Sequence, residues 1–215
     1  MTLGGPRVSG RACTCGSSPG VDRRRTTAPT APGTLVAMTR LDHLLAGRTR
    51  GVCTVDPAAS RVELTMRVCG LLGLRGRFTD VHGHVEWDDD PARCRVHVDV
   101  DTASLTAGSA RRDAVLAAAG IIDPEAGPVI TFRSHSIRSD PGGWRIDGVL
   151  GTDRCALPLR LAVGEPETLP GALRLRARGR VSRDDVVALV ARPSAGVLLG
   201  PHAQLDLTLV VGGIS

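Results

Sequence analysis

Three histidines and a glutamate are the residues whose types and spacing best suit metal binding. His82, His84 and Glu86 alternate along one segment, and His97 lies on the next. If the two segments form a hairpin centred near Asp90–Pro91, His84 lies opposite His97, and imidazole with carboxylate is a typical divalent-metal set. All four belong to the polar face of their segments, however. We therefore interpret them as solvated side chains and predict no metal site.

Four arginines form a second candidate site, because they alternate along one segment: Arg174, Arg176, Arg178 and Arg180. Such a row suits a pyrophosphate head group or an anionic membrane surface. A charged row on a strand is more often its solvated outer face, and we expect that here.

Neither the hydroxyl nor the thiol groups predict catalysis. Ser134-His135-Ser136 contains a nucleophile and a base, but adjacent strand residues point to opposite faces, and no G-x-S-x-G elbow occurs. The six cysteines form no C-x-x-C pair, so we expect scattered reduced thiols and no structural zinc. We predict no catalytic residue, no enzymatic activity and no cofactor.

The elements that must position these residues are set by strict alternation of apolar and polar side chains, which is typical of half-buried strands. Eight segments show or continue this pattern: Arg61–Val68, Val81–Trp87, Cys94–Asp101, Ile130–Ile137, Trp144–Leu150, Leu157–Val163, Leu173–Ser182 and Leu205–Val211. Two segments break it. Ser109–Ala119 is rich in Ala and predicts a short helix that ends at Gly120, and Asp184–Ala191 predicts a second, weaker helix.

Eight strands that each hide one face predict an all-β fold, an antiparallel barrel with one or two short helices in its long connections. A barrel of this size is either filled by its own side chains or holds one slender ligand. Both alternatives stay open from alternation alone. The inward positions that we expect to line the lumen are Val62, Leu64, Met66, Val85, Trp87, Val98, Phe132, Trp144, Ile146, Leu159, Leu175 and Leu207.

Composition excludes several classes of protein. The chain has 215 residues, of which 42% are hydrophobic and 2% aromatic, so a core can form but a base-stacking platform for nucleic acid lacks its parts. All 27 basic residues are arginines; the formal charge is +6 over residues 1–54 and −1 over the remainder. A phosphate-binding footprint is therefore not expected on the folded part. The longest stretch without a polar side chain, Ala114–Ile122, is too short to span a membrane.

Residues 1–50 are rich in Gly, Pro and Arg, and this composition predicts a disordered tail in front of a barrel domain at 51–215. Arg23-Arg24-Arg25 is not followed by an apolar stretch, so we expect a cytoplasmic protein. Met38 is an alternative start of the chain. A homodimer is compatible with the sequence.

Six short motifs, in order, make Val55–Val211 resemble the YceI-like family of bacterial barrel proteins. They are Val55-Asp56-Pro57 with Ser60 and Val62, Leu74-Arg75-Gly76-Arg77-Phe78, Ser104-Leu105-Thr106 with Arg112-Asp113 and Leu116, Pro128-Val129-Ile130-Thr131-Phe132, Gly148-Val149-Leu150 with Leu157-Pro158, and Ser182-Arg183-Asp184-Asp185. The resemblance implies a lipocalin-like barrel that binds polyisoprenoid or another long apolar lipid in its lumen. The alternative is a self-filled barrel that acts as an interaction module.

Overall fold

The computed structural model describes residues 50–70, 72–88, 90, 92–121 and 128–214. The predicted tail lies outside the described residues except for Arg50, and so does the alternative start at Met38. In the described part of the chain no helix is long and apolar enough to cross a bilayer.

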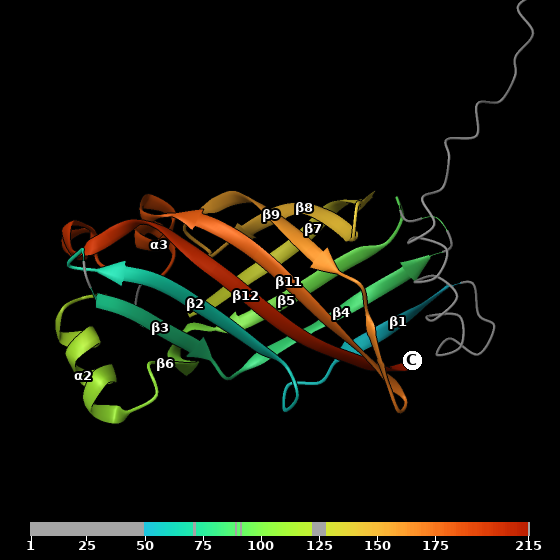
Figure 1. Cartoon of the computed structure of the whole chain (residues 1–215), viewed down its shortest axis with the longest axis horizontal. Coiled ribbons are helices and arrows are strands. Elements are labelled where there is room, and N and C mark those ends of the chain that lie inside the picture. Colours follow the sequence, from blue (N-terminus) through green and yellow to red (C-terminus); the bar gives the residue numbers. More distant parts are fainter. Residues whose placement is uncertain (1–49, 71, 89, 91, 122–127, 215) are drawn as a thin grey trace, which may run out of the picture.

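Strands make up most of the described chain and join one antiparallel sheet (Figure 1). They are β1 (Arg50–Val55), β2 (Arg61–Val68), β3 (Leu72–Phe78), β4 (Val81–Asp88), β5 (Arg95–Asp101), β6 (Leu105–Thr106), β7 (Val129–Asp140), β8 (Gly143–Gly151), β9 (Ala156–Gly164), β10 (Glu167–Leu169), β11 (Ala172–Ser182) and β12 (Leu199–Ile214). The short helices are η1 (Thr102–Ser104), α2 (Ala110–Ala118), α3 (Arg183–Val190) and η2 (Pro193–Leu198).

Eight of these strands close into a ring, in the order β1, β4, β5, β7, β8, β9, β11, β12 and back to β1. The last strand closes the ring because β11 pairs along one of its edges, while β2 and then β1 pair along the other. Its Leu205 pairs with Leu64 of β2, and further along Val211 pairs with Val55 of β1. The predicted eight-stranded antiparallel barrel is confirmed.

Alternation did not predict four strands, β1, β3, β6 and β10, and two of these, β1 and β3, bear on the arrangement of the barrel. The predicted first strand, Arg61–Val68, is β2, whereas the closed ring passes through β1. A turn at Asp56, whose carboxylate accepts a hydrogen bond from the Ala58 amide at 2.9 Å, separates them. The unpredicted strand β3 pairs with β2. Its glycines, Gly73 and Gly76, weaken the apolar alternation that marks a strand in sequence.

The strand predicted over Ile130–Ile137 is longer in the structure and carries a bulge. β7 spans Val129–Asp140, and its register against β8 shifts between Ser134 and Ser136. The extra residue breaks the alternation of inward and outward side chains, which is why the pattern there was the least regular of the eight.

Both predicted helices are present, and both lie at the same end of the barrel (Figure 1). The hydroxyl of Ser109 caps α2 by accepting from the Arg112 amide. A capping box begins α3: Ser182 accepts from the Asp185 amide, and the Asp185 carboxylate accepts from the Ser182 amide at 2.9 Å. The strands and their connections therefore place two helices next to one mouth of the barrel.

Candidate functional site

A cavity of about 70 Å³ lies in the middle of the barrel, and apolar side chains alone line it. Several strands contribute two successive inward residues each, so the cavity spans two levels of the lumen. The lining residues are Val62, Leu64, Phe78, Val98, Val100, Ile130, Phe132, Leu150, Leu159, Leu161, Val181, Leu205 and Leu207 of the barrel and Val186, Leu189 and Val190 of α3. Such a lining favours an apolar ligand and offers no group for acid–base chemistry.

Helix α3 covers one side of the cavity with Val186, Leu189 and Val190, all of them buried. It packs against β11, β12 and η2. One further contact ties the helix to the barrel: the Cys155 thiol, in the β8–β9 connection, donates to the Ala188 carbonyl at 3.5 Å. The helix therefore forms part of the cavity wall and is held at its start by its capping box.

The structure divides the twelve predicted lumen residues into two groups. Six line the cavity: Val62, Leu64, Val98, Phe132, Leu159 and Leu207. The other six belong to or pack against the same hydrophobic core, but they lie outside the cavity lining: Met66, Val85, Trp87, Trp144, Ile146 and Leu175. Ligand contact by any of the twelve stays a prediction.

Both tryptophans thus lie away from the cavity, although we expected them to line the lumen. Trp144 pairs with Val163 at the start of β8, and Trp87 pairs with Gly51 near the end of β4. This end of the barrel is filled by its own side chains. Leu173, which pairs with Val211 toward this end, has only 1% of its surface exposed. The lumen therefore has a cavity in its middle and closely packed, buried side chains toward the end opposite the helices.

Sequence reasoning missed ten lining residues, for two different reasons. Val100, Ile130, Leu161, Val181 and Leu205 continue alternations that had been recognised, so the same signal could have identified them. Phe78 lies on a strand that was not predicted, and Leu150 is the last residue of a predicted strand. The three residues of α3 gave no such signal, because period-2 alternation says nothing about which helix will lie over the mouth of a barrel.

Two buried hydroxyl groups accept hydrogen bonds from the backbone. The Ser134 hydroxyl accepts from the Val96 amide at 2.8 Å, and the Ser60 hydroxyl accepts from the Val210 amide at 2.9 Å. His135 points to the opposite face, as an exposed residue between buried Ser134 and half-buried Ser136. The Ser-His-Ser sequence therefore forms no nucleophile and base pair.

The predicted register of the histidine hairpin is confirmed, with His84 directly opposite His97. Their ring centroids are 5.1 Å apart, and the Asp99 carboxylate lies 3.1 Å from His97 Nε2. Glu86 is 3.7 Å from His84 Nε2. Within the described ranges no group of three or more His, Cys, Asp or Glu side chains is arranged to hold a metal ion.

Three members of the arginine row form ion pairs on the outer face. Arg174 and Arg176 both contact Glu167, at 3.0 and 3.2 Å, and Arg178 contacts Asp206 at 3.2 Å. These pairs neutralise part of the charge that an anionic head group would need.

Glu63 is the most buried carboxylate among the described residues, with 9% of its surface exposed. Arg75 donates to it at 2.6 Å, and Arg77 donates through two nitrogens at 3.1 and 2.8 Å. These hydrogen bonds, with the charges of the two guanidinium groups, hold the pKa of the Glu63 carboxyl below its usual range. The pair of arginines therefore fixes β3 onto β2.

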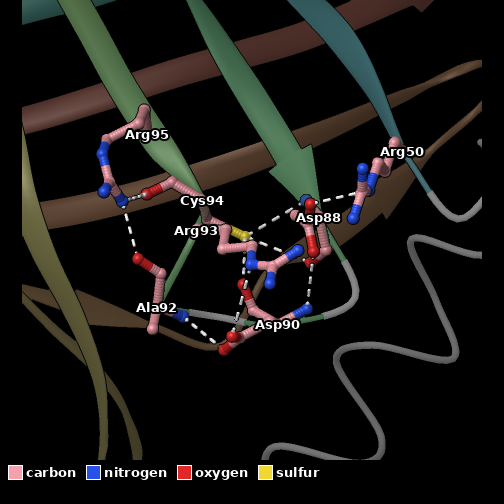
Figure 2. Close-up of polar contacts among 7 residues, drawn as sticks. All are labelled: Arg50, Asp88, Asp90, Ala92, Arg93, Cys94 and Arg95. Carbon is pink, nitrogen blue, oxygen red and sulfur yellow. Dashed lines mark hydrogen bonds and ion pairs between the residues drawn. The ribbon is translucent and has the colours of Figure 1, made fainter.

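The β4–β5 connection lies at the end of the barrel away from the helices (Figure 1), and Figure 2 shows the polar contacts that hold it. Asp88 accepts from the Asp90 amide at 3.0 Å, and Asp90 accepts from the Ala92 amide at 2.9 Å. The Cys94 thiol donates to the Asp88 carbonyl at 3.3 Å, and Arg50 of β1 forms a 2.8 Å ion pair with Asp88. Burial raises the pKa of the Cys94 thiol, so the sulfur stays protonated and serves as a structural group.

Comparisons with known proteins agree with this architecture. Protein YceI of Escherichia coli is 28% identical over 160 residues, which cover 71% of this chain and 80% of that protein. A UPF0312 protein of Serratia proteamaculans is 26% identical over the same shares. Among solved structures, BcnA of Burkholderia cenocepacia superposes with a TM-score of 0.57 at 19% identity, covering 73% of this chain and 98% of BcnA.

A polyisoprenoid binding domain from Saccharophagus degradans superposes with a TM-score of 0.51 at 13% identity, covering 75% of this chain and 98% of that domain. These two structural similarities concern the fold. The YceI-like domain model matches residues 53–206, which is more than half of the chain and includes six strands of the closed ring in full and parts of β1 and β12. The chain therefore belongs to the YceI-like family.

Proposed function

We propose that this protein binds a slender apolar lipid, of the polyisoprenoid class, in the lumen of its barrel and that it catalyses no reaction. The observation that carries the proposal is the wholly apolar lining of the cavity. Each CH₂ group that moves from water into such a site contributes about 0.8 kcal/mol, so binding needs no polar contact. The description of the Saccharophagus domain as polyisoprenoid binding supports the same ligand class.

The size of the cavity favours a second candidate, a self-filled barrel that acts as an interaction module. A volume of about 70 Å³ is less than half of the roughly 150 Å³ cavity that binds benzene in an engineered protein. Lipid binding therefore requires the lining side chains or α3 to move outward, at a cost that the burial of the ligand must exceed.

Mass spectrometry of an organic extract from the purified full-length protein separates the two candidates. Lipid binding predicts one recurring apolar species at close to one equivalent per chain. Val98→Phe, which adds bulk at the cavity wall, should reduce that species at least tenfold. Val149→Phe is the matched control, because Val149 is 42% exposed on the outer face, and it should retain the lipid. An empty extract from all three proteins would support the self-filled barrel instead.

A further inference from the structure

We infer that the lumen accepts only a short length of apolar chain, about eight to ten carbons, and that Ile146 is a chief residue setting this limit. The inference rests on the proposed function and adds to it the length of the ligand segment inside the barrel. The length limit follows from the packed side chains at the end of the lumen opposite the helices, because a longer chain would have to penetrate them.

The length of the cavity follows from the register of the strands that line it. Val98 and Val100 of β5, and Leu159 and Leu161 of β9, are successive inward residues. Successive inward positions lie about 7 Å apart along a strand. Two such levels, with van der Waals contact at either end, enclose about 10 Å of chain. An extended hydrocarbon advances about 1.3 Å per carbon, because bonds of about 1.5 Å form a zigzag. The two lined levels therefore match the length of about eight carbons, once the lining side chains or α3 have moved outward to widen the space.

A layer of buried side chains forms the floor of this cavity on the side away from the helices. It consists of the next inward residue with a side chain on three strands of the ring: Val96 on β5, Ile146 on β8 and Leu209 on β12. All three are at most 9% exposed, and none of them lines the cavity.

Ile146 is the first side chain beyond the cavity on β8 because the inward residue before it is Gly148. A Cβ at Gly148 would lie 2.5 Å from two ring atoms of Phe132, so the aromatic ring already occupies the space that glycine leaves. Ile146 pairs directly with Leu161, a lining residue, and Trp144 pairs with Val163 immediately behind it.

A hydrogen bond to the backbone also holds this layer of side chains in place. It limits how far the layer can move away from the cavity. The Ser134 hydroxyl holds the Val96 amide at 2.8 Å beside the β7 bulge. Further behind, Leu173 pairs with Val211, and Leu173 has only 1% of its surface exposed. A chain that reaches the floor therefore meets a second layer of buried core side chains.

The test measures the affinity of the full-length protein for primary n-alkanols from six to sixteen carbons, with a fluorescent apolar probe displaced by each alcohol. We expect Kd to fall about fourfold per added CH₂ up to eight to ten carbons, and to stay level beyond that length, because later carbons remain outside the cavity. Ile146→Ala should move the levelling point, the chain length at which Kd stops falling, to alcohols that are two to three carbons longer. Leu173→Ala, a comparable truncation deeper in the core, should leave the levelling point unchanged.

The wild-type series tests the inference even if Ile146→Ala does not fold, and Ile146→Val provides a milder shift. A Kd that continues to fall through sixteen carbons overturns the length limit while lipid binding stands. If the protein binds none of the alcohols, the proposed function itself is contradicted. The failure of the length limit and the failure of lipid binding are therefore distinguishable. Equal levelling points in Ile146→Ala and wild type would remove the assignment to Ile146.

Discussion

Glu63 is the residue at which local electrostatics most directly supports the fold. Its carboxylate is nearly excluded from water and accepts three hydrogen bonds from Arg75 and Arg77. We predict that Glu63→Gln lowers the free energy of unfolding at pH 7 by about 1–2 kcal/mol, a figure reduced by the exposure of both arginines. Urea denaturation measures the change. Glu86→Gln, at an exposed carboxylate 3.7 Å from His84, should change stability by less than about 0.5 kcal/mol.

The lowered pKa of Glu63 also predicts how this contribution depends on pH. A carboxyl whose pKa is lower in the folded state binds fewer protons there, so its stabilisation is complete above the unfolded pKa of about 4.3. It is then lost as pH falls through the folded pKa. The stability difference between wild type and Glu63→Gln should therefore shrink below about pH 4.3. A difference that is constant from pH 6 to pH 3 would contradict this role.

Gly179 keeps space open for a cavity side chain. A Cβ at this position would lie 2.8 Å from a terminal methyl group of Leu161, which lines the cavity, and 3.3 Å from the Arg160 carbonyl. We predict that Gly179→Ala displaces Leu161 into the cavity and weakens binding of an apolar probe about tenfold. Gly164→Ala is the control, because its Cβ meets only the Arg176 carbonyl, at 4.0 Å. Unchanged affinity in a folded Gly179→Ala protein would show that the cavity tolerates the displaced side chain.

At the scale of elements, α3 is the part of the cavity wall that can separate from the barrel without breaking strand pairing. Its start depends on the capping box of Ser182 and Asp185. We predict that Ser182→Ala destabilises the helix by about 1 kcal/mol and speeds exchange of a bound probe about fivefold, because the helix opens more often. Stopped-flow displacement measures the rate. Ser109→Ala removes the N-cap of α2, which contributes no residue to the cavity lining, and should leave the rate unchanged.

For the molecule as a whole, binding in the lumen must appear as stability, because the site exists only in the closed barrel. A ligand at about 100 times its Kd stabilises the folded state by about 2.7 kcal/mol. For a domain of this size we predict a rise in Tm of about 5–10 °C with decanol, measured by calorimetry. Val98→Phe should show no rise. A rise of equal size in that variant would place the binding outside the cavity.

Alternation of apolar and polar residues was sufficient to predict the barrel. A strand with one apolar face must bury that face, and eight such strands bury theirs when the sheet closes into a barrel. It identified Val62, Leu64, Val98, Phe132, Leu159 and Leu207, which line the cavity. It failed for β1 and β3, where a turn and two glycines interrupt the pattern. It also could not separate Trp144 or Ile146 from the lining residues, since inward side chains at every level carry the same apolar signal.

The sequence by itself determined which face of each strand is buried, where the two short helices begin and that the lumen is apolar, because these properties depend on residue type and local spacing. Only the tertiary structure decided how the lumen is divided. The space left between inward side chains depends on the register of eight strands and on the packing of α3. The Phe132 ring fills the space at Gly148, and Trp144 lies behind Ile146, through pairings between residues distant in sequence.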